Sequence, residues 1–203
     1  YYEERDVNQA KVYLDKWVAT SDQDCKSAYF VADYYFRAGQ PQESLNRAKA
    51  MDNGACKTYP YLNLLYAVNY DKLGDSLQAK SYLDKFFTTA PSDKIISENY
   101  VTAARIYSKI PGNESTASTY LQKAIDEDTM MSHKINYAND AITMMASSGN
   151  LQNELLWMNK LATYRGGSLT EADYYKLSNS ADNALKKTDT IRMQNKDTVA
   201  IMN

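Results

Sequence analysis

The stretch AVNYDKLGDSLQAKSYLDKFFTTAP, residues 67–91, decides the fold. Small and large side chains recur around Gly74 at steps of three and four residues: Ala67, Tyr70, Ala79, Leu83 and Phe86. Spacings of three and four place side chains on one face of an α-helix. Glycine readily takes the left-handed conformation that ends a helix. The stretch therefore predicts two amphipathic helices joined by a tight turn at Gly74.

The same pattern recurs along the chain. Second-helix ladders begin at residues 10, 44, 79, 117 and 154, which gives steps of 34, 35, 38 and 37 residues. The ladders are Ala10, Leu14, Trp17; Ser44, Ala48, Met51; Ala79, Leu83, Phe86; Ala117, Leu121, Ala124; and Glu154, Met158, Leu161. First-helix positions recur as Ala32 and Tyr35, Ala67 and Tyr70, Ala104 and Tyr107, and Ile142 and Met145, with turn glycines Gly39, Gly74 and Gly149. The period predicts an array of helix pairs with Tyr35, Tyr70 and Tyr107 in its core.

This pattern resembles the tetratricopeptide repeat (TPR), whose signature of small residue, Tyr, Gly, Ala, aromatic and Pro spans about 34 residues. Residues 59–92 carry most of the signature, ending in Pro91. The preceding unit departs from it with Ser44 for Ala and Cys56 where Pro is usual, and no unit has the leading Trp. The resemblance, to TPR array proteins of the bacterial cell envelope, implies an all-α fold. The expected architecture is an α-α superhelix, a TPR-type solenoid of antiparallel helix pairs.

The period also predicts the organisation of the chain. We expect a truncated first repeat at 1–22, repeats at 23–58, 59–92 and 93–130, a degenerate repeat at 131–166, and a terminal capping helix and tail at 167–203. Tyr1 aligns with Tyr35 of the next unit, which predicts a fragment of a longer array. Thr170 is the expected N-cap of the last helix, whose pattern fades beyond Lys187.

Composition and motifs speak against an enzyme. The 23 Lys and Arg against 25 Asp and Glu give a net charge of −2, which gives no electrostatic case for nucleic-acid binding. The single histidine, His133, is interpreted as a surface or capping residue, because no catalytic partner has matching spacing. The acidic cluster 126–128 lacks the pattern of a calcium loop and is interpreted as a solvated helix end. We therefore predict no catalytic residues, no metal and no cofactor.

The cysteines and the short motifs leave the compartment open. Cys25 and Cys56 are interpreted as two buried free thiols, with a disulfide in an oxidising compartment as the alternative. No apolar run reaches the roughly 20 residues that span a bilayer. Four Asp-Ser/Thr-apolar triplets, at 75–77, 128–130, 189–191 and 197–199, are similar to the O-glycan acceptor of some Gram-negative commensals' exported proteins, although Asp-Ser/Thr also caps helices. A periplasmic or envelope location is favoured over a cytoplasmic one.

The opposite face of the first helices holds the candidate binding site. In a stacked array these helices line the concave surface. The predicted groove residues are Tyr29, Asp33, Phe36, Leu64, Val68, Val101 and Arg105. They predict a non-enzymatic scaffold that holds a peptide or protein partner, and they do not reproduce the Lys/Asn carboxylate clamp of chaperone-binding TPR domains. The alternative is the helical repeat part of an exported envelope protein involved in glycan handling or outer-membrane assembly.

Overall fold

The computed structural model describes residues 12–14, 16, 24–52 and 54–201, with side chains up to residue 188. Its regular elements in this described part are all helical, and they fall into two compact units, Tyr1–Ile95 and Ile96–Asn203. The first unit contains α2 (Cys25–Arg37), α3 (Pro41–Met51), η1 (Ala55–Thr58), α4 (Leu62–Lys72), α5 (Ser76–Thr89) and η2 (Ser92–Lys94). The second contains α6 (Ser97–Ser108), α7 (Glu114–Glu127), α8 (Met131–Ser148), α9 (Leu151–Tyr164) and α10 (Glu171–Ile201).

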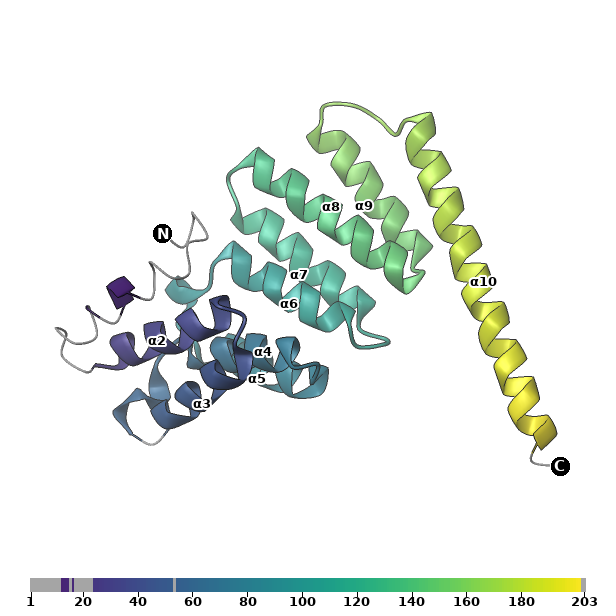
Figure 1. Cartoon of the computed structure of the whole chain (residues 1–203). Coiled ribbons are helices and arrows are strands. Elements are labelled where there is room, and N and C mark those ends of the chain that lie inside the picture. The colour runs from purple at the N-terminus through teal and green to yellow at the C-terminus, as the bar shows by residue number, and fades with distance from the viewer. Residues whose placement is uncertain (1–11, 15, 17–23, 53, 202–203) are drawn as a thin grey trace. The chain divides into compact units, whose positions relative to one another are not determined.

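Helices pair in chain order within each unit. In the first unit α2 packs on α3 and α4 on α5, and in the second α6 packs on α7 and α8 on α9, each pair running antiparallel (Figure 1). The pairs also stack, because α3 contacts α4 and α7 contacts α8. The predicted all-α fold of antiparallel helix pairs is confirmed. One pair lies in each of the ranges 23–58, 59–92, 93–130 and 131–166, although the repeat boundaries themselves stay a prediction. Ala10 and Trp17 of the first ladder lie outside the described residues.

The second-helix ladders form the core. From Ser44 to Leu161, every ladder position is at most 7% exposed. Small residues at these positions let neighbouring helices approach closely, and the large ones fill the space between them. The prediction for the tyrosines was right at Tyr107, and Tyr70 is half-buried but packs against the core cluster. It was wrong at Tyr35, which is only half-buried. Tyr35 lies at the edge of its pair, where the Arg47 guanidinium covers its ring at 4.5 Å from the centroid, and Tyr70 stacks on Tyr82.

Tyr34 and Tyr66 are the buried tyrosines of α2 and α4. Tyr66 is 2% exposed, and its hydroxyl donates to the Asp52 carboxylate at 2.5 Å. Each of the two lies one or four residues from the predicted position, on the side of the helix that faces its own hairpin partner or the preceding pair. The ladder spacing finds the correct helix. In α2 the adjacent pair Tyr34 and Tyr35 leaves the inward face unspecified by spacing alone.

The last helix runs further than the sequence pattern indicates. Thr170 is confirmed as its cap, because its hydroxyl accepts a hydrogen bond from the Asp173 amide at 3.3 Å. Helix α10 then continues past Lys187 to Ile201. It packs on α9 and leaves Tyr174, Tyr175 and Leu185 exposed.

The turn at Gly74 has the geometry that the sequence predicts. Gly74 has φ of +85°, and the Asp75 amide donates back to the Tyr70 carbonyl at 2.9 Å, closing α4 with a Schellman motif. The Asp75 side chain then accepts from the Gln78 amide at 3.0 Å and caps the start of α5. One short segment therefore ends one helix and begins the next.

Replacing Gly74 with alanine tests this turn. A Cβ there would meet nothing within 4 Å, so the cost comes from the left-handed backbone alone. We expect Gly74→Ala to lower the free energy of unfolding by about 1 kcal/mol. Gly54, which is also uncrowded and has φ of 173°, provides the matched control. Urea denaturation should show no loss for Gly54→Ala, and equal stability of the two variants would contradict the assignment.

Candidate partner-binding surfaces and a cavity in the second unit

Five of the predicted groove residues lie on the first helices of the first unit. Tyr29, Asp33 and Phe36 are on α2, and Leu64 and Val68 are on α4, which contacts α2. All five are half-buried. Tyr29, Phe36 and Val68 pack against the core cluster of this unit, so only part of each side chain remains accessible. Asp33 is engaged by the Arg37 guanidinium at 2.7 Å.

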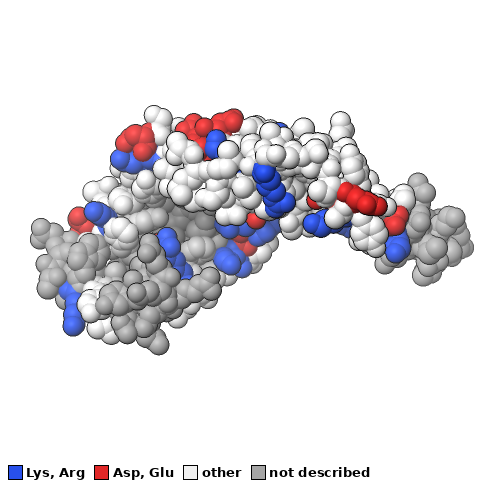
Figure 2. Space-filling view, turned by 90° about the horizontal axis from the view of Figure 1, so that it is seen from above, with Lys and Arg blue, Asp and Glu red and all other residues white. Residues whose placement is uncertain are grey.

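The other two predicted residues, Val101 and Arg105, lie on α6 of the second unit. Val101 is half-buried and Arg105 is exposed. Helix α6 contacts α8, where burial raises the pKa of Asp140 and the positive charge of Arg105 acts in the opposite direction. This face therefore places a cation near a carboxylate. On the face drawn in Figure 2, the described Lys, Arg, Asp and Glu side chains lie in small mixed groups rather than in one continuous basic surface.

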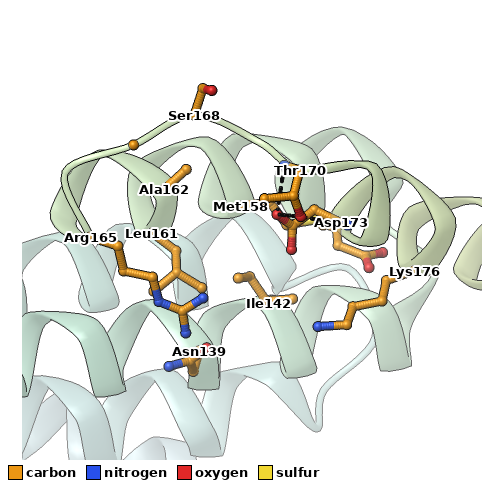
Figure 3. A pocket seen from close by; sticks show the side chains of 12 residues that line it. Asn139, Ile142, Met158, Leu161, Ala162, Arg165, Ser168, Thr170, Asp173 and Lys176 are labelled. Atoms are coloured by element: carbon orange, nitrogen blue, oxygen red, sulfur yellow. Dashed lines mark hydrogen bonds between the residues drawn. The ribbon is translucent and has the colours of Figure 1, made fainter.

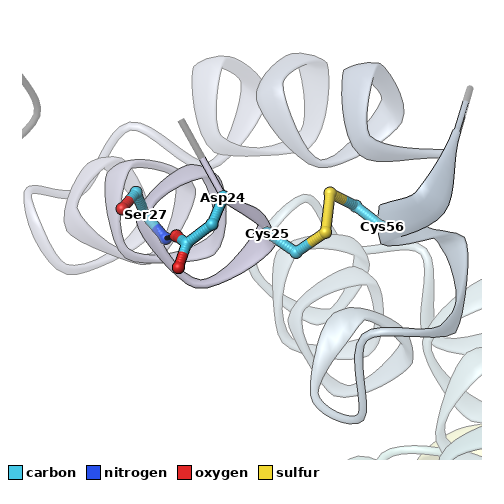
Figure 4. The surroundings of a disulfide bond; sticks show 4 residues. All are labelled: Asp24, Cys25, Ser27 and Cys56. Carbon is cyan, nitrogen blue, oxygen red and sulfur yellow. Dashed lines mark hydrogen bonds between the residues drawn. A yellow bond between two sulfur atoms is a disulfide. The ribbon is translucent and has the colours of Figure 1, made fainter. Parts of the chain in front are cut away.

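Cys25 and Cys56 form a disulfide, with an S–S distance of 2.08 Å and Cα atoms 5.1 Å apart (Figure 4). The interpretation of two free thiols is therefore wrong. The physical reason is the hairpin: α3 returns antiparallel to α2, so the residues just after α3 come back beside the start of α2. The disulfide thus joins the first turn of α2 to η1. Asp24 caps the same helix by accepting from the Ser27 amide at 2.8 Å.

A group of aromatic rings lies beside this disulfide-linked end. The Tyr29 ring is 5.0 Å from that of Tyr59 and 6.1 Å from that of Tyr61, measured between centroids. Tyr61 in turn stacks on Phe86 of α5 at 6.4 Å. Burial raises the pKa of both Tyr29 and Tyr59, which keeps these phenols neutral. Tyr59 and Tyr61 were missed from the sequence because they lie between helices, where the ladder spacing gives no signal.

Asp128 joins the two helix pairs of the second unit. Its carboxylate accepts from the Met130 amide at 2.8 Å, and lies 3.0 Å from both the His133 imidazole and the Tyr137 hydroxyl. Ser97 of α6 adds a contact at 3.3 Å. The interpretation of residues 126–128 as a solvated helix end is wrong at Asp128, which is 9% exposed, because the chain turns inward there to begin α8. His133 is half-exposed beside this carboxylate, in keeping with a capping role.

A cavity of about 310 Å³ lies between α8, α9 and the beginning of α10 (Figure 3). Ile142, Met158, Leu161 and Ala162 give it apolar walls. Its polar lining includes Asn139, Glu154, Arg165, Thr170, Asp173 and Lys176. Glu154 is 1% exposed, and burial raises the pKa of its carboxyl group. In the sequence, the signal for this site is Glu154, because the corresponding position of the other ladders is serine or alanine.

The described residues were also searched for metal sites and for membrane-spanning helices. Among them, no three or more His, Cys, Asp or Glu side chains gather as a metal site would require. Within the same residues, no helix has the length and apolarity needed to cross a membrane.

Reducing the disulfide should weaken the first unit. Linking residues 31 apart in sequence restricts the unfolded chain, and we expect its loss to lower the free energy of unfolding by about 3 to 4 kcal/mol. Urea denaturation with and without a phosphine reductant measures this loss. The Cys25→Ala/Cys56→Ala double variant is the control, because reductant should leave it unchanged. Full alkylation of both thiols in the unreduced, denatured protein would contradict the disulfide.

The carboxylate of Asp128 should make the second unit sensitive to acid. Its hydrogen bond from the Met130 amide, with further ones from His133 and Tyr137, lowers its pKa from 3.8 to about 2. The stabilisation is therefore complete above pH 3.8 and is lost as the pH falls through about 2. We expect Asp128→Asn to melt at a lower temperature than the wild type at pH 7, with the gap closing toward pH 2. Asp126→Asn, two residues away and exposed, should melt as the wild type does, and a gap for Asp128→Asn that persists at pH 2 would contradict this account.

Comparison with known proteins supports the fold. No protein-family model and no curated protein matches the chain. Among solved structures, the chain is similar to the C-terminal part of a TPR repeat-containing protein from Cytophaga hutchinsonii, with a TM-score of 0.56 and 21% sequence identity. The match covers 80% of this chain and 61% of that one. Identity this low speaks to the fold alone: the chain has a TPR-like, all-α helical repeat fold.

Proposed function

We propose that this protein is a non-enzymatic interaction scaffold that holds a peptide or protein partner on the surface of its first helices. The observation that carries the proposal is a difference in burial between the first and second helices of the first three pairs. The second helices bury their ladders almost completely, whereas the first helices keep the predicted groove residues partly accessible. The part of each half-buried side chain that remains accessible, together with the exposed Arg105, is available for a partner.

The chemistry of this surface fits an amphipathic peptide. In the first unit, the accessible edges of Tyr29, Phe36, Leu64 and Val68 offer apolar contacts beside the Asp33–Arg37 ion pair. In the second unit, Val101 and Arg105 repeat the combination of an apolar and a charged side chain. Aromatic side chains and arginine are the usual energetic anchors of interfaces, and a helix surface of this kind accepts extended or helical segments.

The disulfide favours a second candidate, the helical repeat part of an exported envelope protein involved in glycan handling or outer-membrane assembly. Disulfides persist in oxidising compartments such as the bacterial periplasm. The neighbouring cluster of Tyr29, Tyr59 and Tyr61 offers aromatic faces for a sugar ring. Both candidates use non-covalent recognition and differ in the ligand.

Selection from a phage-displayed random peptide library tests the scaffold proposal. We expect enriched peptides with apolar residues spaced for an extended or helical segment. Leu64→Ala on α4 should weaken the selected peptides at least five-fold, measured by fluorescence anisotropy, as truncation of an interface anchor does.

Leu77→Ala is the matched control for Leu64→Ala. Leu77 lies on the second helix α5 and is 72% exposed, so its truncation should leave peptide binding unchanged. Equal binding by all variants would refute the first-helix surface. Binding on a glycan array without any peptide enrichment would favour the second candidate instead.

A further inference from the structure

Glu154 is out of place in the ladder that builds the core. The corresponding second-helix positions hold Ser44, Ala79 and Ala117, and all of them are fully buried. Ser44 is hydrogen-bonded by Asn69 of the following helix, at 2.8 Å between Oγ and Nδ2. Glu154 makes the same kind of link, because its Oε1 accepts from the Ser180 hydroxyl of α10 at 2.9 Å. One carboxylate oxygen of Glu154 therefore makes a polar contact with the following helix, as the shorter side chain of Ser44 does in its own pair.

The second carboxylate oxygen has no such role. Oε2 of Glu154 is buried without a hydrogen-bond partner among the described residues, in a side chain that is 1% exposed. A buried carboxylate oxygen that lacks a donor destabilises a fold, and native proteins contain few of them. Since the neighbouring pairs build the same position with alanine, the core does not require a glutamate there. This oxygen therefore has room to accept a hydrogen bond from a group beyond the described residues.

The cavity beside Glu154 has room for that donor. Its volume of about 310 Å³ is at the lower end of the range for small-molecule sites. Ile142, Met158 and Leu161 provide walls for an apolar chain. The cavity is continuous with Glu154, which is one of its lining residues.

Two cations complete the lining. Figure 3 shows Arg165 of α9 and Lys176 of α10 extending over the cavity from its two sides. Among the described residues, neither lies within 4 Å of a carboxylate. Asp173, which also lines the cavity, accepts from the Thr170 amide at 2.9 Å and hydroxyl at 2.7 Å, and these hydrogen bonds, with the positive charges of Lys176 and Arg165, lower its pKa. Lys176 lies one helical turn before Ser180, or about 6 Å along α10. Arg165 lies eleven residues from Glu154 on α9, or about 16 Å.

We propose that this cavity binds a small zwitterion with an apolar middle, the chemistry of an amino acid or of a short peptide. The ligand's ammonium group would donate to Oε2 of Glu154, its apolar part would contact Ile142, Met158 and Leu161, and its carboxylate would meet Lys176, or Arg165 in a longer ligand. A simple amine would satisfy Glu154 but meet the two cations, and a simple carboxylate would meet the two acidic lining residues, Glu154 and Asp173. The combination of charges selects a ligand that carries both. This site is distinct from the α2, α4 and α6 residues of the proposed partner surface.

Isothermal titration with matched probes tests this site. The probes are 6-aminohexanoate, n-hexylammonium and n-hexanoate, which share a six-carbon chain and differ in charge. We expect 6-aminohexanoate to bind at least ten-fold more tightly than either singly charged probe at pH 7.5. Glu154→Gln, which keeps the size of the side chain, should weaken it at least ten-fold, and Lys176→Gln should weaken it several-fold. Glu171→Gln makes the same change at an exposed position of α10 and should bind as the wild type does.

Every other outcome overturns the proposal. Equal affinity for n-hexylammonium would show that the two cations play no part, and preferential binding of n-hexanoate would show that Glu154 does not select the ligand. No heat from any probe would leave the cavity as a gap in helix packing. Should Glu154→Gln fail to fold, Glu154→Ala restores the residue found at Ala79 and Ala117 and should also lose the zwitterion. Because Leu64→Ala should not change these titrations, failure here is distinguishable from failure of the partner surface.

Discussion

The fold depends on close contact between helices at the ladder positions of the second helices. Ser44, Ala79 and Ala117 are all fully buried, and their small side chains leave space that larger ladder members such as Leu83, Phe86 and Leu121 fill. Because an α-helix repeats every 3.6 residues, one small position followed by large ones at steps of four and three forms a continuous inward face. Each pair then presents a surface that the next pair covers, which is why the repeats in a unit stack rather than fold alone.

This periodicity explains why so much of the fold is readable from the sequence. The ladders, the turn at Gly74, the cap at Asp75 and the start of α10 at Thr170 all follow from short-range rules that act within one helix or turn. Tyr35 and Tyr70 show the limit of those rules. Tyr34 and Tyr35 are adjacent, so the rotation of α2, set by its packing partners, decides which of them is buried. Tyr66 and Tyr70 lie four residues apart on one face of α4 and both stack on Tyr82, so their burial differs by position along the helix.

The features that the sequence does not predict are contacts between segments distant in the chain. The disulfide depends on the return of α3 beside α2, and the burial of Asp128 depends on the path between α7 and α8. The Tyr59 and Tyr61 rings lie in a connection whose conformation no periodic pattern describes. For the candidate site, the spacing identifies which residues of the first helices share the outer face. It does not predict how far Tyr29, Phe36 and Val68 pack into the core.

The disulfide and the buried carboxylate of this protein both lie at positions that depart from the repeat pattern. Cys56 stands where a TPR usually has proline, and its disulfide with Cys25 links α2 to η1 within the first unit. Glu154 stands where the other pairs have a small residue. It lines a cavity, and one of its carboxylate oxygens has no partner among the described residues. A periodic fold tolerates such substitutions because each pair contacts only its neighbours. The loss of stability caused by an unfavourable group therefore stays within one pair and its neighbours. The proposed ligand would supply the donor that Glu154 lacks among the described residues, and its own carboxylate would meet the cations that also line the cavity.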